Sequence, residues 1–393
     1  MDQVGAPERG DGRLPVPRRR PAGAIAFHHR RRRPRWHRIA LTASLALLLL
    51  LGLSVGGGFI YYRKLDSGLR RTGVLREVHD LRPAIAPGGA QNFLLLGTDS
   101  RDPGDSGGSD NSGNSGDSGG GPAQAQPQAP VETRADVIVL MHVDAAHRKA
   151  YLISVPRDLY VSVPQSATTA GSGDTPAKIN TAFARGGLPL VVQTVERYTG
   201  VRVDHLVMVD FEGFKKVTDV VGGVDVTNGQ EFTSIGEPYH RTFKKGTIHL
   251  NGAEALDYVR QRQQFTDGDA VRTCHQQQFV KALLDKATGT GLLGDPRALD
   301  AFLRSVTTML TVDSGFSLAD AALQFRNIRT ADLTFLTSPN LGPTTVGDES
   351  VRMPDDAKAK ALYDAVANDT VADWVAHNAA GPSNIEPGTC AEQ

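Results

Sequence analysis

The chain has 393 residues, 40% of them hydrophobic, and is long enough to bury one large domain or two smaller ones. Its formal net charge of zero conceals a split, because residues 1–38 hold eleven Arg and three acidic residues, a local charge of +8 (11 − 3). The basic run Arg30–Arg33 does not indicate nucleic-acid binding, since no folded domain surrounds it. The absence of a P-loop, a zinc-ligand cluster, a Gly-x-Ser-x-Gly elbow and a catalytic Cys–His pair disfavours covalent catalysis.

The first 62 residues indicate a membrane anchor. Residues 1–38 are rich in Pro and Arg, which predicts a disordered cytoplasmic tail. Residues 39–62 carry no charge and are long enough to cross the roughly 30 Å of bilayer hydrocarbon as a helix. Because the larger positive charge precedes this segment, we expect a single-pass signal anchor with the rest of the chain extracytoplasmic. A cleaved signal peptide fits less well, since no Ala-x-Ala site follows.

Residues 63–130 alternate between apolar and polar segments. Residues 63–90 are expected to form a juxtamembrane linker with a short helix. The apolar run Phe93–Leu96 ends at Gly97 and predicts a buried strand. Residues 102–130 are almost entirely Gly, Ser, Asp, Asn and Pro, apart from a few Ala and Gln, which predicts a flexible insertion. An active-site lid is the alternative, but this composition favours an inert insertion.

From residue 137 onward, predicted strands and helices alternate, which indicates an α/β sheet covered on both faces. We assign residues 91–340 to one catalytic domain and residues 341–393 to a tail with one short helix near 357–367. The expected strands are 137–143, 151–155, 205–209 and 333–337, and the expected helices are 179–184, 188–198, 211–221, 252–262, 274–286, 296–310 and 318–328.

Five polar clusters occur in order, each where an apolar run gives way to a loop. Arg presents a planar fork that matches phosphate oxygens, and Asp supplies the hard oxygen ligands that a small divalent cation prefers. The ordered set therefore predicts a pyrophosphate site with bound Mg²⁺, or alternatively Mn²⁺. The clusters are Gly97–Arg101, Arg134–Asp136, Pro156–Asp158, Arg260–Arg262 and Arg272–Gln276.

Two aspartates are the candidate metal ligands. Asp99 follows a predicted strand and Asp136 precedes one, so neighbouring strands would bring both carboxylates to one sheet edge. Arg134 lies two residues before Asp136 and would share its face of the strand. The alternatives for single clusters are a turn role for Asp99 and complementation of a helix dipole by Arg260 and Arg262.

These clusters resemble the LytR-CpsA-Psr family of cell-wall glycopolymer transferases, and the resemblance runs from about Gln91 to Leu284. The family implies a central mixed sheet, and an extracytoplasmic enzyme that moves a glycopolymer from a polyprenyl-pyrophosphate carrier to peptidoglycan. The segments that carry the resemblance are Asn92–Arg101, Ser154–Tyr160, Lys178–Asn180, Val209–Phe214, Gly222–Asp225, Leu250–Gly252 and Ala255–Arg262.

The resemblance also implies roles for individual residues. Asp99 and Asp136 match the family's metal ligands, and Arg134, Arg157 and Asp136 are the catalytic candidates. The candidates for contacting the pyrophosphate are Arg101, Arg134, Arg157, Arg260, Arg262, Arg272 and Gln276. The chain departs from the family in two ways: the two aspartates are unusually far apart, and His275 stands where an arginine is usual. We expect His275 to make a partial phosphate contact or to lie just behind the contacting residues.

Direct displacement at phosphorus fits these residues best. A peptidoglycan hydroxyl would attack the sugar-side phosphorus, with Asp99, Asp136 or no residue as the base. A polyprenyl-pyrophosphate hydrolase and a non-catalytic polyprenyl-phosphate-binding scaffold are the alternatives.

Two further features leave alternatives open. Cys274 and Cys390 both fall on the predicted outer side, where an even count favours a disulfide over two free thiols. Apolar residues at helical spacing would either pack in the core or line a slot for a polyprenyl tail; they are Phe211, Phe214, Val217, Val220 and Val221.

Overall fold

A computed structural model describes residues 60–78, 82–98, 135–166, 173–235, 240–289 and 294–378 together with Cys390, with the backbone alone at 135–136. All of these belong to one compact unit, Phe59–Gln393. Most of the predicted anchor, residues 39–59, lies outside the described residues, and so does the predicted insertion 102–130. Within the described ranges no helix has both the length and the apolar character needed to cross a membrane.

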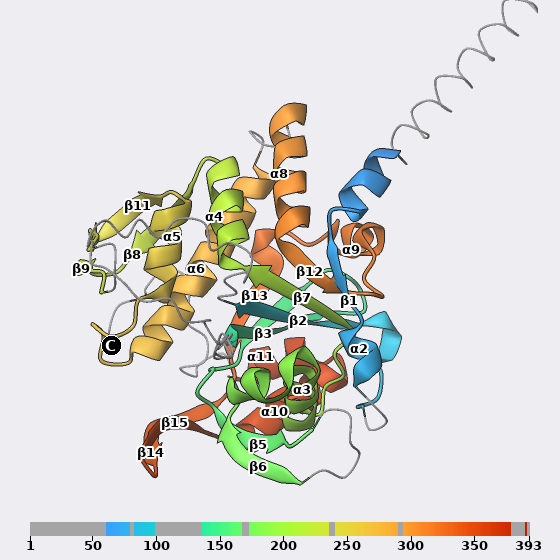
Figure 1. Ribbon diagram of the computed structural model, residues 1–393, viewed down its shortest axis with the longest axis vertical. Coiled ribbons are helices and arrows are strands. Elements are labelled where there is room, and N and C mark those ends of the chain that lie inside the picture. The colour runs from blue at the N-terminus through green and yellow to red at the C-terminus, as the bar shows by residue number, and fades with distance from the viewer. Residues whose placement is uncertain are drawn as a thin grey trace, which may run out of the picture. The chain divides into compact units, whose positions relative to one another are not determined.

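A seven-stranded mixed sheet organises the unit, in the order β1-β12-β7-β2-β3-β4-β13 (Figure 1). The pairs β1–β12, β7–β2 and β4–β13 are parallel, and the other three are antiparallel. The strands are β1 (Arg70–Thr72), β2 (Gln91–Thr98), β3 (Ala135–Val143), β4 (Ala150–Ser154), β7 (His205–Asp210), β12 (Leu310–Asp313) and β13 (Leu333–Thr337).

Alternating residues of the central strands enter two cores, one on each face of the sheet. Leu94 and Leu96 of β2 lie in the larger core, whereas Phe93 lies in the smaller one. Because successive side chains of a strand point to opposite faces of the sheet, a single strand contributes residues to both cores. The larger core is covered by α2 (Val74–Glu77), α3 (Thr181–Thr199) and α10 (Asp356–Ala367), with α11 (Val371–Asn378) beside α10; the smaller is covered by α9 (Leu318–Phe325) (Figure 1). The predicted α/β class with helices on both faces is therefore confirmed.

A third core is built from the chain between β7 and α8 (Pro296–Met309). Its centre is Tyr258, fully buried and edge-on to Phe243 at 5.3 Å between ring centroids. The elements involved are α4 (Phe211–Val220), α5 (Gly252–Arg260), α6 (Gly268–Thr288), β8 (Val224–Asn228), β9 (Phe232–Thr233), β10 (Thr242–Phe243) and β11 (Gly246–Leu250). Of the residues considered for a polyprenyl slot, Phe214 packs on Phe279 at 4.4 Å and Val217 is buried, so these two serve core packing.

Several bounds differ from the predicted ones. Helix α6 begins at Gly268, before the expected residue 274, because Asp267 caps it by accepting a hydrogen bond from the Ala270 N–H at 3.2 Å. The remaining elements are η1 (Pro87–Gly89), β5 (Tyr160–Pro164), β6 (Asp174–Lys178), α8 (Pro296–Met309), η2 (Thr330–Asp332), β14 (Asn340–Val346) and β15 (Glu349–Pro354).

The segment after residue 340 is more than a tail with one short helix. It forms the β14–β15 hairpin, which projects from the body beside β5 and β6, followed by α10 and α11 (Figure 1). Leu362, Tyr363 and Val366 of α10 are buried in the larger core. The reason is their spacing: residues three to four apart on a helix share a face, and here that face is apolar.

Candidate active site at one sheet edge

The carboxyl ends of β2, β4, β7 and β13 lie at the same edge of the sheet as the start of β3. Thr98 at the end of β2 pairs with Ala135 at the start of β3 and with Asp210 at the end of β7. The Ser338 N–H, just after β13, donates to the Ser154 carbonyl at the end of β4 at 2.8 Å. Ligands of open α/β sheets commonly bind at such an edge.

Three predicted site residues, Asp99, Arg101 and Arg134, lie outside the described residues, and so does the side chain of Asp136. Asp99 directly follows Thr98 in the sequence, and Asp136 directly follows Ala135. Within the described part of the chain, no group of three or more His, Cys, Asp or Glu residues could hold a metal ion.

Three of the predicted arginines do converge. Arg157 follows β4 and places its Nε 3.5 Å from a carboxylate oxygen of Asp158. Arg262 follows α5, with its Nη1 4.0 Å from Asp158 and 3.9 Å from Asp269. Arg272 of α6 places its Nη2 3.0 Å from the same Asp269 oxygen. The three guanidinium groups therefore share two carboxylates, which leaves an excess of positive charge beside the sheet edge.

Arg272 is the most enclosed member of this arginine cluster. Its side chain is only 10% exposed. Burial lowers the pKa of its guanidinium, Asp269 opposes that shift, and the neighbouring Arg157 and Arg262 add to it. An arginine nevertheless keeps its proton in proteins. A buried cation crowded by two like charges is stabilised by an anion, and a diphosphate brings more than one negative charge to share among them.

The start of α6 fits tightly against the loop that carries Arg262. A Cβ placed on Gly268 would lie 1.9 Å from the Arg262 carbonyl oxygen. Only glycine allows this approach, because the obstacle is backbone that cannot turn aside. Glycine at position 268 therefore lets Arg262 and Arg272 lie close together although they are ten positions apart in the sequence.

Two other predicted contacts lie along the interface of α5 with its neighbours. The Arg260 guanidinium carbon sits 4.8 Å from the ring centroid of Phe211, the residue that follows the end of β7. Arg260 therefore reaches the same sheet edge from α5. The Gln276 amide donates to the Val259 carbonyl at 3.4 Å, which ties α6 to α5.

His275 faces the third core instead of the arginine cluster. It is 1% exposed and stacks on two neighbouring rings, that of Tyr258, at 4.0 Å between ring centroids, and that of Phe232, at 5.6 Å. Burial lowers the pKa of His275 to about 4. The expectation that this imidazole contacts a phosphate group is wrong, because the side chain is buried on the face of α6 that packs against α5.

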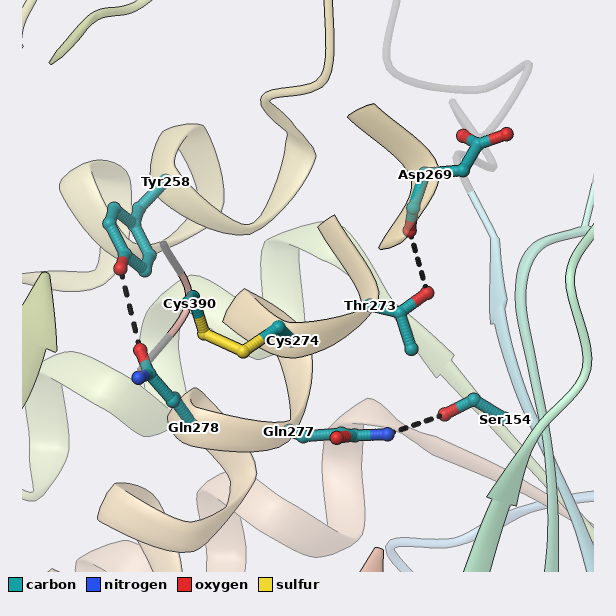
Figure 2. The surroundings of a disulfide bond; sticks show 8 residues. All are labelled: Ser154, Tyr258, Asp269, Thr273, Cys274, Gln277, Gln278 and Cys390. Carbon is teal, nitrogen blue, oxygen red and sulfur yellow. Dashed lines mark hydrogen bonds between the residues drawn. A yellow bond between two sulfur atoms is a disulfide. The ribbon is translucent and has the colours of Figure 1, made fainter. Parts of the chain in front are cut away.

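A disulfide joins Cys274 of α6 to Cys390, with the Cα atoms 5.7 Å apart, as the two cysteines led us to expect (Figure 2). Figure 2 also shows Gln277, whose amide donates to the Ser154 hydroxyl at 3.4 Å, and Thr273, which donates to the Asp269 carbonyl at 2.9 Å. Successive residues of α6 thus contact the sheet edge, Cys390 near the end of the sequence, and the third core.

Sequence reasoning missed two residues at this site. Asp269 holds Arg272 and Arg262, and its position three residues before Arg272 on a helix is a usable signal. Arg352 of β15 places its guanidinium against Asp267 and Asp269. Nothing in the local sequence points to Arg352, since its partners are about eighty residues away.

Known proteins resemble the chain in both sequence and fold. The sequence model described as the LytR_cpsA_psr family matches residues 74–366. The polyisoprenyl-teichoic acid–peptidoglycan teichoic acid transferase TagU of Bacillus cereus is 32% identical over 285 residues, which cover 69% of this chain and 80% of that protein.

Solved structures share the fold. The TagV crystal structure from B. subtilis covers 72% of this chain and 98% of its own, with a TM-score of 0.52 and 24% identity. A LytR-Csp2A-Psr enzyme from Actinomyces oris covers 76% and 96%, with a TM-score of 0.52 and 20% identity. With a family match over more than half of its length, this chain belongs to the LytR-CpsA-Psr family.

Proposed function

We propose that this protein transfers a glycopolymer from a polyprenyl-pyrophosphate carrier to a hydroxyl group of peptidoglycan, with the assistance of Mg²⁺. The assignment to transferases rests on its family and on TagU of B. cereus, which is named for teichoic acid transfer to peptidoglycan. The N-terminal charge pattern and the uncharged segment 39–62 support a membrane-anchored protein with its catalytic domain outside the cytoplasm.

The observation that carries the proposal is the convergence of Arg157, Arg262 and Arg272 on two carboxylates at the edge where β2, β4 and β7 end. Arginine forks bind phosphate oxygens bidentately. Three such side chains close together match the several oxygens and negative charges of a diphosphate better than those of a single carboxylate ligand. Arg260, above the end of β7, adds a fourth cation along the same edge.

The reaction is a displacement at phosphorus. The acceptor oxygen forms a bond to the sugar-side phosphorus, the bridging P–O bond breaks, and polyprenyl phosphate leaves. The arginines turn their N–H donors from Asp158 and Asp269 to the phosphate oxygens and offset the charge that accumulates on the leaving group. Arg134 and Arg157 hold the reacting phosphate in line with the acceptor.

Asp99 and Asp136 are the residues that would hold Mg²⁺. The pairing of Thr98 with Ala135 supports this, since each aspartate directly follows one partner of that pair. When bound, the ion supplies Lewis-acid neutralisation of the diphosphate. The hydroxyl proton leaves late in a loose transition state, so Asp99 or Asp136 serves as base, or solvent accepts the proton.

The test incubates the full-length protein, purified in detergent, with a polyprenyl-pyrophosphate-linked glycan labelled in the sugar, peptidoglycan and Mg²⁺. Label bound covalently to peptidoglycan is the expected result. Label released as soluble glycan phosphate would identify a hydrolase, and donor binding without turnover would identify a scaffold.

Arg272→Lys tests the arginine cluster in the same assay. Lysine keeps the charge but loses the bidentate fork, so transfer should fall about 10- to 100-fold. Arg304→Lys is the matched control, because Arg304 pairs with Asp300 on the exposed surface of α8. Equal transfer by both variants would remove Arg272 from the proposed site.

A further inference from the structure

Arg352 connects three separate parts of the candidate site. Its side chain is 9% exposed. Its guanidinium pairs with Asp267, lies 3.6 Å through Nε from an Asp269 oxygen, and donates through Nη1 to the Asn340 side chain at 3.1 Å. Its backbone N–H donates to the Asp158 carbonyl at 2.9 Å. The β14–β15 hairpin is thereby held against both the Arg157–Asp158 turn and the first turn of α6.

Asp269 is the carboxylate that Arg352 shares with the arginine cluster. Arg272 lies 3.0 Å and Arg262 lies 3.9 Å from its Oδ1, whereas Arg352 approaches its other oxygen, Oδ2. One carboxylate therefore faces the proposed diphosphate site with one oxygen and Arg352 with the other. Asp267 adds a second negative charge on the side of Arg352.

We propose that Arg352 is a positioning residue that compensates Asp267 and Asp269, so that Arg262 and Arg272 remain available to the diphosphate. This inference rests on the proposed function. A diphosphate draws the two arginines away from Asp269, which would leave that carboxylate without a cation beside a negatively charged ligand. Arg352, which approaches the other oxygen of Asp269, then remains as the cation that neutralises this carboxylate. Without it, Asp269 retains Arg262 and Arg272 and its charge repels the ligand.

The experiment measures binding of inorganic pyrophosphate to the full-length protein in detergent by titration calorimetry. Arg352→Met removes the charge at similar side-chain length, and binding should weaken about tenfold, the low end of what residues behind a binding site contribute. Arg352→Lys keeps the charge and should bind more tightly than Arg352→Met. If the Met variant folds poorly, Arg352→Lys compared with the wild type decides the question, because this variant keeps the charge and should retain most of the affinity for pyrophosphate.

A second substitution separates charge compensation from packing. Asp267→Asn removes one carboxylate but preserves the helix cap, because Asn caps helices as well as Asp does. In the Arg352→Met background it should recover most of the lost affinity.

Arg82→Met is the matched control. It breaks the buried pair with Glu196, and Arg82 also donates to the carbonyl of Val203, near the opposite end of β7. That variant should lose stability but bind pyrophosphate as the wild type does.

Each other outcome overturns the inference in a recognisable way. Wild-type affinity for pyrophosphate in Arg352→Met would show that Asp267 and Asp269 do not need the positive charge of Arg352. Failure of Asp267→Asn to restore binding would reduce Arg352 to a packing residue. A wild-type protein that does not bind pyrophosphate would overturn the proposed function itself, and with it this inference.

Discussion

The imidazole of His275 stacks on the phenol ring of Tyr258, with ring centroids 4.0 Å apart and planes inclined by 27°. This pair places a titratable group inside the third core, one helical turn from the buried Arg272. The surroundings of His275 are aromatic, with Phe232 stacked at 5.6 Å and Phe265 edge-on at 5.8 Å between ring centroids. Burial there favours the neutral imidazole and lowers its pKa to about 4.

The pH dependence of stability should follow from His275. The unfolded chain binds the proton near the ordinary pKa of 6.5, and the folded chain binds it only near 4. Between those values the unfolded state holds more protons, so stability rises with pH there and is lost as pH falls from 6.5 towards 4. The loss attributable to this group is at most about 3 kcal/mol.

Chemical denaturation at pH 4.5, 5.5 and 7 measures how the free energy of unfolding depends on pH. His275→Phe keeps an aromatic ring in the stack and removes the titration, so the unfolding free energy should depend less on pH over this range. His249→Phe is the control, because His249 is exposed and pairs with Asp225. An unchanged slope in His275→Phe would argue that His275 does not titrate differently in the two states.

The Cys274–Cys390 bond should stabilise the fold. It closes a loop across a sequence separation of 116 residues, for which the chain-entropy account gives about 4–5 kcal/mol. Cys390→Ser should lower the melting temperature, and reduction of the wild type should lower it equally. Thiol titration of the unfolded, unreduced chain should find no free thiol, and two free thiols would refute the pairing.

Gly268→Ala should weaken pyrophosphate binding and stability together. The added Cβ meets the Arg262 carbonyl at 1.9 Å, so either α6 or the Arg262 loop must shift. A cost of about 1–3 kcal/mol is typical of such overpacking. Gly294→Ala is the matched control, since no atom lies within 4 Å of its Cβ position. Unchanged affinity in Gly268→Ala would mean that this close approach does not set the spacing of the arginines.

Asp99→Asn and Asp136→Asn should each lower Mg²⁺-dependent transfer about 100-fold or more, the loss typical when one stabilising group of a charged transition state is removed. Thermal unfolding should remain cooperative in both variants. Asp110→Asn, in the predicted insertion, serves as the control. Normal turnover at limiting Mg²⁺ in either variant would remove that aspartate from the metal site.

Deletion of residues 107–121 should leave stability nearly unchanged. This stretch contains only Gly, Ser, Asp and Asn, and it buries almost no apolar surface in any conformation. Shortening a flexible loop changes its closure entropy by only about 0.6 kcal/mol per halving. A large loss of transfer with an intact fold would identify the insertion as a lid.

Sequence periodicity sufficed for the elements with strong apolar patterns. The runs that became β2, β4, β7 and α4 were recognisable because alternation and helical spacing follow from local backbone geometry. The two-residue strands β9 and β10 and the hairpin β14–β15 were missed. Such short or exposed strands contain few apolar residues and depend on partners brought by the rest of the fold.

For the arginine cluster, the member residues could be predicted from the sequence, but their arrangement could not. Its members Arg157, Arg262 and Arg272 were identified from the sequence, because each lies in a polar cluster at the edge of an apolar run. Their geometry was decided by contacts outside those clusters: Asp269 between two arginines, Arg352 beside the other oxygen of Asp269, and Gly268 against the Arg262 carbonyl. His275 shows the limit most clearly. Its neighbours in the sequence belong to the site, yet the face of α6 that packs on Tyr258 and Phe232 places it in a core, and only the tertiary structure determines which face that is.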